Sequence, residues 1–171
     1  MVTRLLAAGA LLALASCGYQ VAGHTDLLPK TIQTICIPAF QNTTTRYKLT
    51  DRLPEAIARE FISRTRYHIV PDCTQADAIL NGSVVNYLAG VTIVDPVSGR
   101  ATGVDLHAYL NIKLTERASG KVLFSRPNMD VRERYEVSEN AQQYFEESDA
   151  ALDRVSKAVA LQVVSSILNN F

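Results

Sequence analysis

Alternating apolar and polar residues give the clearest structural signal in the chain. From Val104 to Thr115 every second residue is apolar, and the residues between them are polar or charged. This period of two predicts a strand with one dry face and one face exposed to water. The residues Ala118-Ser119-Gly120-Lys121 predict a hairpin turn, and a return strand is expected from residue 122 to about 137, with an interruption near Pro127.

Shorter apolar stretches, rich in β-branched residues and bounded by proline or glycine, predict further strands. They cover residues 31–40, 67–70 and 76–88. The first and third stretches carry apolar side chains on both faces. Helices are expected on one face only, so the long loop, another chain or lipid should cover part of the second face.

Two segments carry apolar residues at helical spacing. In residues 51–66 the apolar stripe consists of Leu53, Ile57, Phe61 and Ile62. Residues 148–169 carry a second and longer stripe. The order β-α-β-β-β-α predicts an α+β fold, a two-layer sandwich with both helices packed on one face of a mixed sheet of about four strands.

The first residues match a secretory signal that ends at Cys17. Arg4 precedes an apolar run from Leu5 to Ala15, which is too short to span a bilayer as a helix. The end of this run, Leu14-Ala15-Ser16-Cys17, resembles the lipobox of bacterial lipoproteins, in which the cysteine is acylated and the peptide is cut before it. The alternative is an ordinary signal peptide with an incidental cysteine.

The lipobox resemblance implies a division of the chain into three parts. Residues 1–16 are expected to be removed, residues 17–30 to form a lipidated tether, and residues 31–171 to form a single domain. Acyl chains hold such a protein to the membrane, because each buried methylene contributes about 0.8 kcal/mol. Gly18, where retained lipoproteins have aspartate, implies the outer membrane and its periplasmic face.

Export to an oxidising compartment changes the expectation for the two remaining cysteines. With Cys17 acylated, Cys36 and Cys73 form an even pair that can be joined by a disulfide. Such a bond would contribute about 4 kcal/mol in the chain-entropy model. The alternative is two buried free thiols that pack as small apolar groups.

The sequence lacks the usual patterns of catalysis. Its three histidines are far apart, and no metal-ligand spacing, nucleophile elbow or phosphate loop is present. We therefore expect no enzyme activity, no metal and no cofactor. The acidic cluster Glu146, Glu147 and Asp149 is expected to offset the dipole of a helix start. With 17 basic and 17 acidic residues, the chain shows no charge excess that favours nucleic acid.

Several short motifs, in order, resemble the LptE family of lipopolysaccharide-assembly lipoproteins. They are Cys17-Gly18-Tyr19, Ile35-Cys36-Ile37-Pro38-Ala39-Phe40 followed by Asn42-Thr43, Glu60-Phe61 with Arg64-Thr65, and Ala76-Asp77-Ala78-Ile79-Leu80-Asn81-Gly82. The hairpin and the terminal helix follow in the same order. The resemblance implies a plug inside the outer-membrane β-barrel LptD, which it helps to assemble, and binding of lipopolysaccharide during its delivery to the outer leaflet.

Lipopolysaccharide carries phosphates, so its site is expected to use exposed cations. The candidates are Arg100 in a glycine-rich loop, and Lys113, Arg132 and Arg134 on neighbouring strands. Their alternative role is that of a solvated polar face with scattered ion pairs. Two other functions remain open for the chain: an envelope lipoprotein that regulates cell-wall enzymes, and a small hydrolase acting on lipid or glycan.

Overall fold

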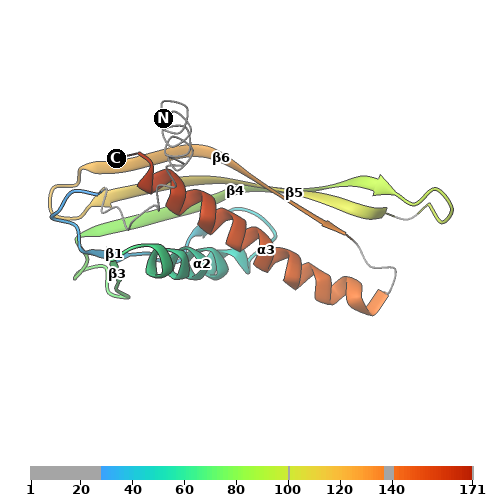
Figure 1. Ribbon diagram of the computed structural model, residues 1–171, viewed down its shortest axis with the longest axis horizontal. Helices are drawn as coiled ribbons and strands as arrows, with labels where there is room; N and C mark the ends of the chain where they lie inside the picture. The colour runs from blue at the N-terminus through green and yellow to red at the C-terminus, as the bar shows by residue number, and fades with distance from the viewer. Residues whose placement is uncertain (1–27, 100, 137–140, 171) are drawn as a thin grey trace, which may run out of the picture.

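The computed structural model describes residues 28–99, 101–136 and 141–170. In the described part, six strands and two helices follow one another in the order shown in Figure 1. The elements are β1 (Thr34–Cys36), β2 (Gln41–Asn42), α2 (Leu49–Arg64), β3 (His68–Ile69), β4 (Ala78–Val94), β5 (Ala101–Glu116), β6 (Val122–Glu136) and α3 (Ala141–Leu168).

The six strands form one mixed sheet. Its strand order is β3-β1-β4-β5-β6, and the short β2 pairs with β4 beside β1. The pairs β1–β3, β1–β4 and β2–β4 are parallel, whereas β4, β5 and β6 run antiparallel. The predicted α+β fold with a mixed sheet is confirmed, although the sheet has six strands rather than about four.

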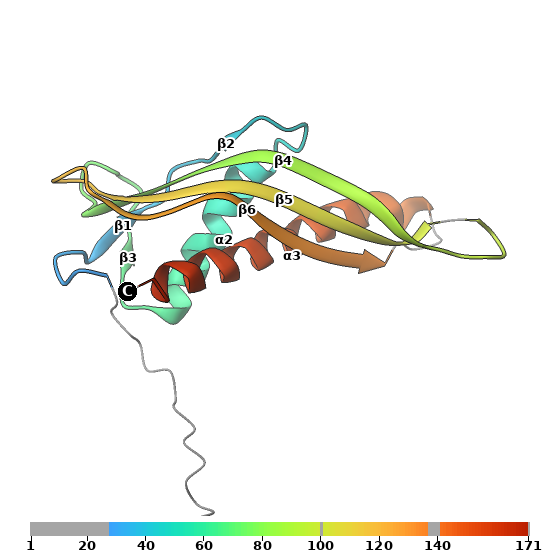
Figure 2. The same ribbon diagram turned by 90° about the horizontal axis from the view of Figure 1, so that it is seen from above.

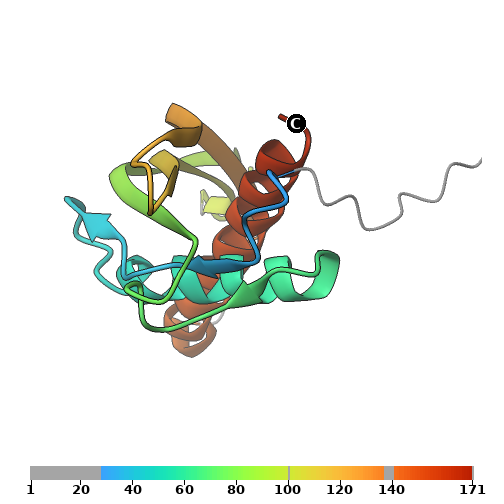
Figure 3. The same cartoon turned by 90° about the vertical axis from the view of Figure 1, so that its left-hand side faces the viewer.

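Both helices lie on one face of the sheet, as expected (Figure 2). The end-on view shows the sheet curling around α3, with α2 packed beside α3 (Figure 3). The buried stripe of α2 consists of Leu53, Ile57 and Phe61, whereas Ile62 was wrongly expected there and is 62% exposed. The stripe of α3 is fully buried at Val155, Val159, Val163 and Ile167.

The first and last residues of several elements differ from those expected from the sequence. The first strand covers only three residues, because Pro38 cannot donate to a ladder. Strand β4 continues six residues beyond the expected Leu88. Helix α3 begins at Ala141 rather than near Ser148.

The second face of the sheet differs from expectation. Cys36 on β1 is buried opposite Ile35, so this strand is covered on both sides. Over β4, β5 and β6, however, the face turned away from the helices is polar, with Asn81, Asp105 and Lys113 among its residues. Several exposed apolar side chains gather instead on the far half of β4.

The described domain starts earlier in the sequence than residue 31. Leu28 is buried, and its N–H donates to the Tyr67 hydroxyl at 3.1 Å. Ile32 is also buried in the same core. The last part of the segment expected to be a tether therefore packs against the domain.

Candidate functional site

Two of the predicted ligand cations, Arg132 and Arg134, lie on the polar face of the sheet and are engaged by carboxylates. Arg134 holds Asp105 with two hydrogen bonds, Nε to Oδ1 at 2.6 Å and Nη2 to Oδ2 at 3.1 Å. Arg132 donates from Nε to Asp130 at 3.0 Å, and His107 Nδ1 lies 3.2 Å from the same carboxylate. Each arginine is thus largely neutralised by a neighbour on the sheet.

These contacts also set the protonation of the carboxylates. The hydrogen bond from Arg134 lowers the pKa of Asp105. Partial burial raises the pKa of Asp130, but the hydrogen bonds from Arg132 and His107 outweigh burial and lower it overall. Both carboxylates are therefore anions at neutral pH, and the cluster is close to charge balance.

Lys113 lies on the same face but in a different environment. It lines a shallow groove of about 460 Å³ together with Asn81, Asn111 and Ser125, and no acidic side chain lines this groove. No ion pair of Lys113 occurs among the residues that the structure describes. It is therefore available to bind an anionic group.

The structure does not bring together the three candidate cations that it describes. Arg132 is paired with His107 on β5, six residues from Lys113, which corresponds to about 20 Å at 3.4 Å per residue. Arg100 lies outside the described residues, in the connection between β4 and β5. Arg132 and Arg134 are neighbours on β6, and Lys113 is separate from them.

An apolar surface occupies the far half of β4 and the turn that follows. Its members are exposed by 46% to 94%, and they are Val85, Leu88, Val91, Ile93, Val94 and Val97. Leu88 pairs with His107 on the polar face, while Val91 pairs with the buried Val104 on the helix side. We call these six residues the apolar tip. Figures 1 and 2 show that the β4–β5 hairpin extends past α3 at this end.

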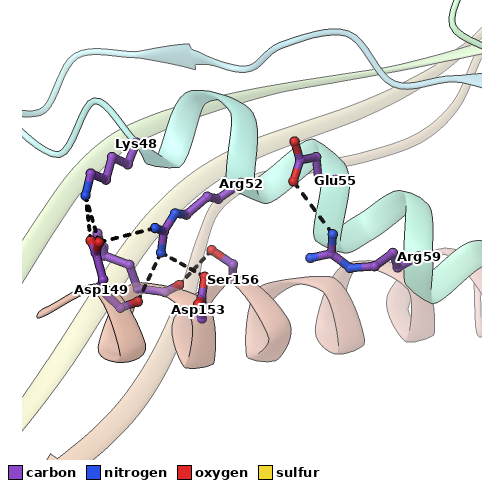
Figure 4. A network of polar contacts seen from close by, with 8 residues as sticks. Lys48, Arg52, Glu55, Arg59, Asp149, Asp153 and Ser156 are labelled. Atoms are coloured by element: carbon purple, nitrogen blue, oxygen red, sulfur yellow. Dashed lines mark hydrogen bonds and ion pairs between the residues drawn. The ribbon is translucent and has the colours of Figure 1, made fainter. Parts of the chain in front are cut away.

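A network of ion pairs joins the two helices (Figure 4). Lys48 Nζ lies 2.7 Å from Asp149 Oδ1, and Arg52 Nη1 lies 2.8 Å from Asp153 Oδ1. The hydrogen bond from Lys48 lowers the pKa of Asp149. Asp149 is more than two turns into α3, so its role is to bind α2, and the expectation that it offsets the dipole of the helix start is wrong.

The motifs around β1 and the start of β4 hold the parallel part of the sheet together. Asp77 Oδ2 accepts hydrogen bonds from Gln33 N–H, Thr34 N–H and the Thr34 hydroxyl, each at 2.8–2.9 Å. Gly82 lies under the ring of Phe40, where a Cβ atom would overlap the ring carbons. The residues that carried the family resemblance therefore act here as structural contacts.

The structure also joins Cys36 to Cys73 by a disulfide, with 5.1 Å between their Cα atoms. Cys36 is buried at the end of β1, and Cys73 lies in the segment between β3 and β4. The bond therefore fixes the segment that covers this edge of the sheet. Cys17, the expected acylation site, lies outside the described residues.

The sequence analysis missed the cross-strand pairing of Arg134 with the carboxylate of Asp105. Alternation placed Asp105 and His107 on the wet face, but it could not show which residues of β6 face them. The missed apolar tip had a sequence signal, because Val91, Ile93 and Val94 continue the pattern of the preceding strand.

Within the described ranges, no group of three or more histidine, cysteine or acidic residues could hold a metal ion. The helices found in these ranges are all too short or too polar to cross a membrane.

The overall fold is similar to those of several solved structures of low sequence identity. Rare lipoprotein B from Shewanella oneidensis is 10% identical with a TM-score of 0.52, and the match covers 80% of this chain and 95% of that chain. The hypothetical protein CT253 from Chlamydia trachomatis is 10% identical with a TM-score of 0.55, covering 80% and 96%. An uncharacterized lipoprotein B from Nitrosomonas europaea is 16% identical with a TM-score of 0.51, covering 85% and 87%. These likenesses show the fold.

Sequence comparison identifies the family. No curated protein matches the chain. The family model for LptE, described as lipopolysaccharide-assembly, matches residues 32–167, which include every strand and nearly all of α3. The resemblance expected from the sequence motifs is thereby confirmed, and the chain belongs to the LptE lipopolysaccharide-assembly family.

Proposed function

We propose that this chain is a lipid-anchored outer-membrane subunit that plugs the β-barrel LptD, helps it to assemble and assists delivery of lipopolysaccharide to the outer leaflet. The match to the LptE family over residues 32–167 carries the proposal. Acylation of Cys17 is the proposed anchor, and it holds the domain on the periplasmic face of the outer membrane. The proposed role is structural and needs no catalytic group.

The apolar tip supports a role in binding a large partner. Six exposed aliphatic side chains lie on one hairpin, beside the polar face that carries Asp105 and Arg134. Exposed apolar side chains gathered beside polar residues are typical of interaction surfaces, and here they lie on both faces of the hairpin. A barrel wall or its loops could cover both faces of a hairpin that extends beyond the helices.

Co-purification from detergent-solubilised outer membranes tests this function. We expect a large β-barrel protein in a one-to-one complex with the acylated chain. Recovery of cell-wall enzymes in place of a barrel would favour the regulatory alternative. Intact mass of the purified chain tests the anchor, since acylation of Cys17 adds the mass of its acyl chains and cleavage of the peptide bond before Cys17 removes residues 1–16.

We propose Arg100 and Lys113 as the first contacts for the phosphates of lipopolysaccharide. Arg100 belongs to the same β4–β5 connection as the exposed Val97, so a cation and an apolar surface lie close together in the sequence. Lys113 has no acidic neighbour in its groove. Arg132 and Arg134 are less suited, because Asp130 and Asp105 already accept their hydrogen bonds.

We predict that Arg100→Glu weakens lipopolysaccharide binding about tenfold, because a charge-assisted hydrogen bond to phosphate is replaced by repulsion. Binding of labelled lipopolysaccharide to the purified chain measures the effect. Lys121→Glu, in the turn at the other end of β5, is the matched control and should leave binding unchanged. Unchanged binding by folded Arg100→Glu would remove Arg100 from the site.

A further inference from the structure

A pocket of about 350 Å³ lies beside the first described residues, at the β3 edge of the sheet. Its floor is apolar, since Leu28, Ile32 and Tyr67 are all buried. Its lining includes the basic side chains of Lys30 and Arg66 together with His68. The pocket belongs neither to the apolar tip nor to the polar face of the sheet.

The charge of this pocket is one-sided. Among the described residues that line it, none is acidic. Lys30, Arg66 and His68 are exposed, and none of them forms an ion pair within the described part of the chain. One described carboxylate in this region is that of Asp77, whose Oδ2 accepts a hydrogen bond from the N–H of the lining residue Gln33. The same oxygen also accepts two hydrogen bonds from Thr34, so Asp77 is already engaged by these groups. This local excess stands out in a chain with balanced charge.

The position of the pocket relative to Cys17 in the sequence determines how far from the proposed membrane anchor it can lie. Cys17 precedes Leu28 by eleven residues, which span at most about 40 Å when fully extended. If Cys17 is acylated, the pocket is therefore held within reach of the leaflet that contains the acyl chains. A guanidinium and an ammonium group over an apolar floor match a phosphate joined to a glycerol and acyl chains.

We propose that this pocket binds the headgroup of an anionic phospholipid in the membrane that carries the anchor. Arg66 and Lys30 hold the phosphate, and the buried floor of Leu28, Ile32 and Tyr67 receives the apolar part next to it. The lipid would fix how the domain is oriented on the membrane. This inference rests on the proposed function for the nearness of the membrane, but binding at the pocket does not itself need the anchor.

A titration of the full-length acylated protein in neutral detergent tests the proposal. The probes are short-chain phosphatidylglycerol, short-chain phosphatidylcholine and inorganic phosphate, and the readout is the backbone amide shifts of Gln33 and His68. We expect saturable shifts with phosphatidylglycerol, none with phosphatidylcholine, and much weaker ones with inorganic phosphate. The double variant Lys30→Glu/Arg66→Glu should bind phosphatidylglycerol about tenfold or more weakly.

The control is Lys121→Glu/Arg126→Glu, which makes the same change of charge at exposed positions near the β5–β6 turn. It should bind phosphatidylglycerol like the wild type. If Lys30→Glu/Arg66→Glu fails to fold, Lys30→Gln/Arg66→Gln should still weaken binding.

Equal shifts with phosphatidylcholine or inorganic phosphate, or unchanged binding by the folded double variants, would overturn the proposal. So would lipopolysaccharide that displaces phosphatidylglycerol from these residues at lower concentration. Because co-purification of the barrel is measured separately, loss of the pocket and failure of the proposed function give different results.

Discussion

Gly82, at the end of the motif before and within β4, has no side chain, and this allows close contact with Phe40 of the motif around β1. The ring of Phe40 lies where a Cβ atom of residue 82 would stand. Phe40 is buried in the core cluster, and its N–H donates to the carbonyl of Thr50 at 3.0 Å. The glycine at the end of one motif therefore allows the aromatic residue of the other to reach the core, which explains why both occur together.

Gly82→Ala is expected to lower the free energy of unfolding by about 1–3 kcal/mol, because the added methyl group must displace a buried aromatic ring. Urea unfolding measures the change. Gly90→Ala in the same strand is the control and should have a much smaller effect, since nothing lies within 4 Å of its added Cβ. In a Phe40→Leu background, Gly82→Ala should lower the free energy of unfolding by less. If the effects of the two substitutions on this free energy were simply additive, the contact between residue 82 and the Phe40 ring would be contradicted.

Asp77 gives a second prediction at the residue scale, because its charge is coupled to folding. The hydrogen bonds from Gln33 N–H and from Thr34 hold the pKa of this carboxyl below its ordinary 3.8. Its contribution to stability is therefore fully present above that value, and it is lost as the pH falls through the lowered pKa of the folded state.

Asp77→Asn should thus destabilise the protein near neutral pH, and the difference from the wild type should shrink as the pH falls through this acid range. Urea unfolding at a series of pH values measures it. Asp72→Asn is the comparison, since the hydrogen bonds from Thr74 also lower the pKa of Asp72, but among the described residues its carboxylate accepts hydrogen bonds only within its own turn. It should show the same trend with pH at a smaller amplitude. A difference that stays constant at all pH values would show that the charge of Asp77 does not matter.

At the scale of elements, the disulfide joins β1 to the segment before β4. These elements pair in parallel and are distant in sequence, so the loop between them is costly to close. We predict that reduction, or Cys36→Ser with Cys73→Ser, lowers the free energy of unfolding by about 4 kcal/mol in the chain-entropy model. Unfolding with and without reductant measures this, and mass spectrometry after alkylation counts free thiols. Two alkylatable thiols in the folded, unreduced protein would contradict the bond.

The elements themselves could largely be predicted from the sequence, because each carries its own period of apolar residues. The register between β5 and β6 could not. Thr115 pairs with Val122, and an uninterrupted ladder from there would place Arg132 opposite Asp105. Two register shifts along β6 put Arg134 there instead. The second shift occurs beside Asn128, which has a φ of 49° after Pro127, and only the interruption itself was visible in the sequence.

The candidate site was less predictable than the fold, because its contacts also depend on the register between strands. Which cation is free depends on pairs across strands, such as Arg134 with Asp105, and not on the residue types. Arg132 differs, because its partner Asp130 is two residues away on the same face of β6, where the alternation of this strand already places it. The network between α2 and α3 was missed likewise, because Lys48 and Asp149 are far apart in the chain.

At the scale of the whole molecule, the long β4–β5 hairpin determines the shape. Strand β4 has 17 residues, so the ladder is about 55 Å long at 3.3 Å per residue, well beyond the roughly 30 Å of a bilayer's hydrocarbon core. Helix α3 lies along most of this ladder, and only the end of the hairpin extends past it (Figure 2). The exposed Val94 and Val97 lie at this end. A partner that binds the tip can therefore be distant from the β3 edge of the sheet, where the first described residues lie.

We predict that Leu88→Ser/Ile93→Ser reduces the amount of barrel protein that co-purifies with the acylated chain, because both side chains are half exposed and would bury the rest of their apolar area in a complex. The thermal midpoint of the isolated chain should change little. Ile62→Ser/Leu161→Ser is the matched control, since it removes exposed aliphatic residues from the two helices. Equal recovery of the barrel with both double variants would argue against the tip as the partner surface.

The outer edge of β4 has a further consequence. Strand β2 pairs only with Ser83 and Val84, and Thr43 reaches Val85, so beyond this point no described strand lies along that edge. A row of unsatisfied amide and carbonyl groups beside aliphatic residues is a template on which a strand of another copy can grow. If the proposed function holds, protein made without the barrel would then seed ordered aggregates through this hairpin, and the barrel would protect the open edge of β4.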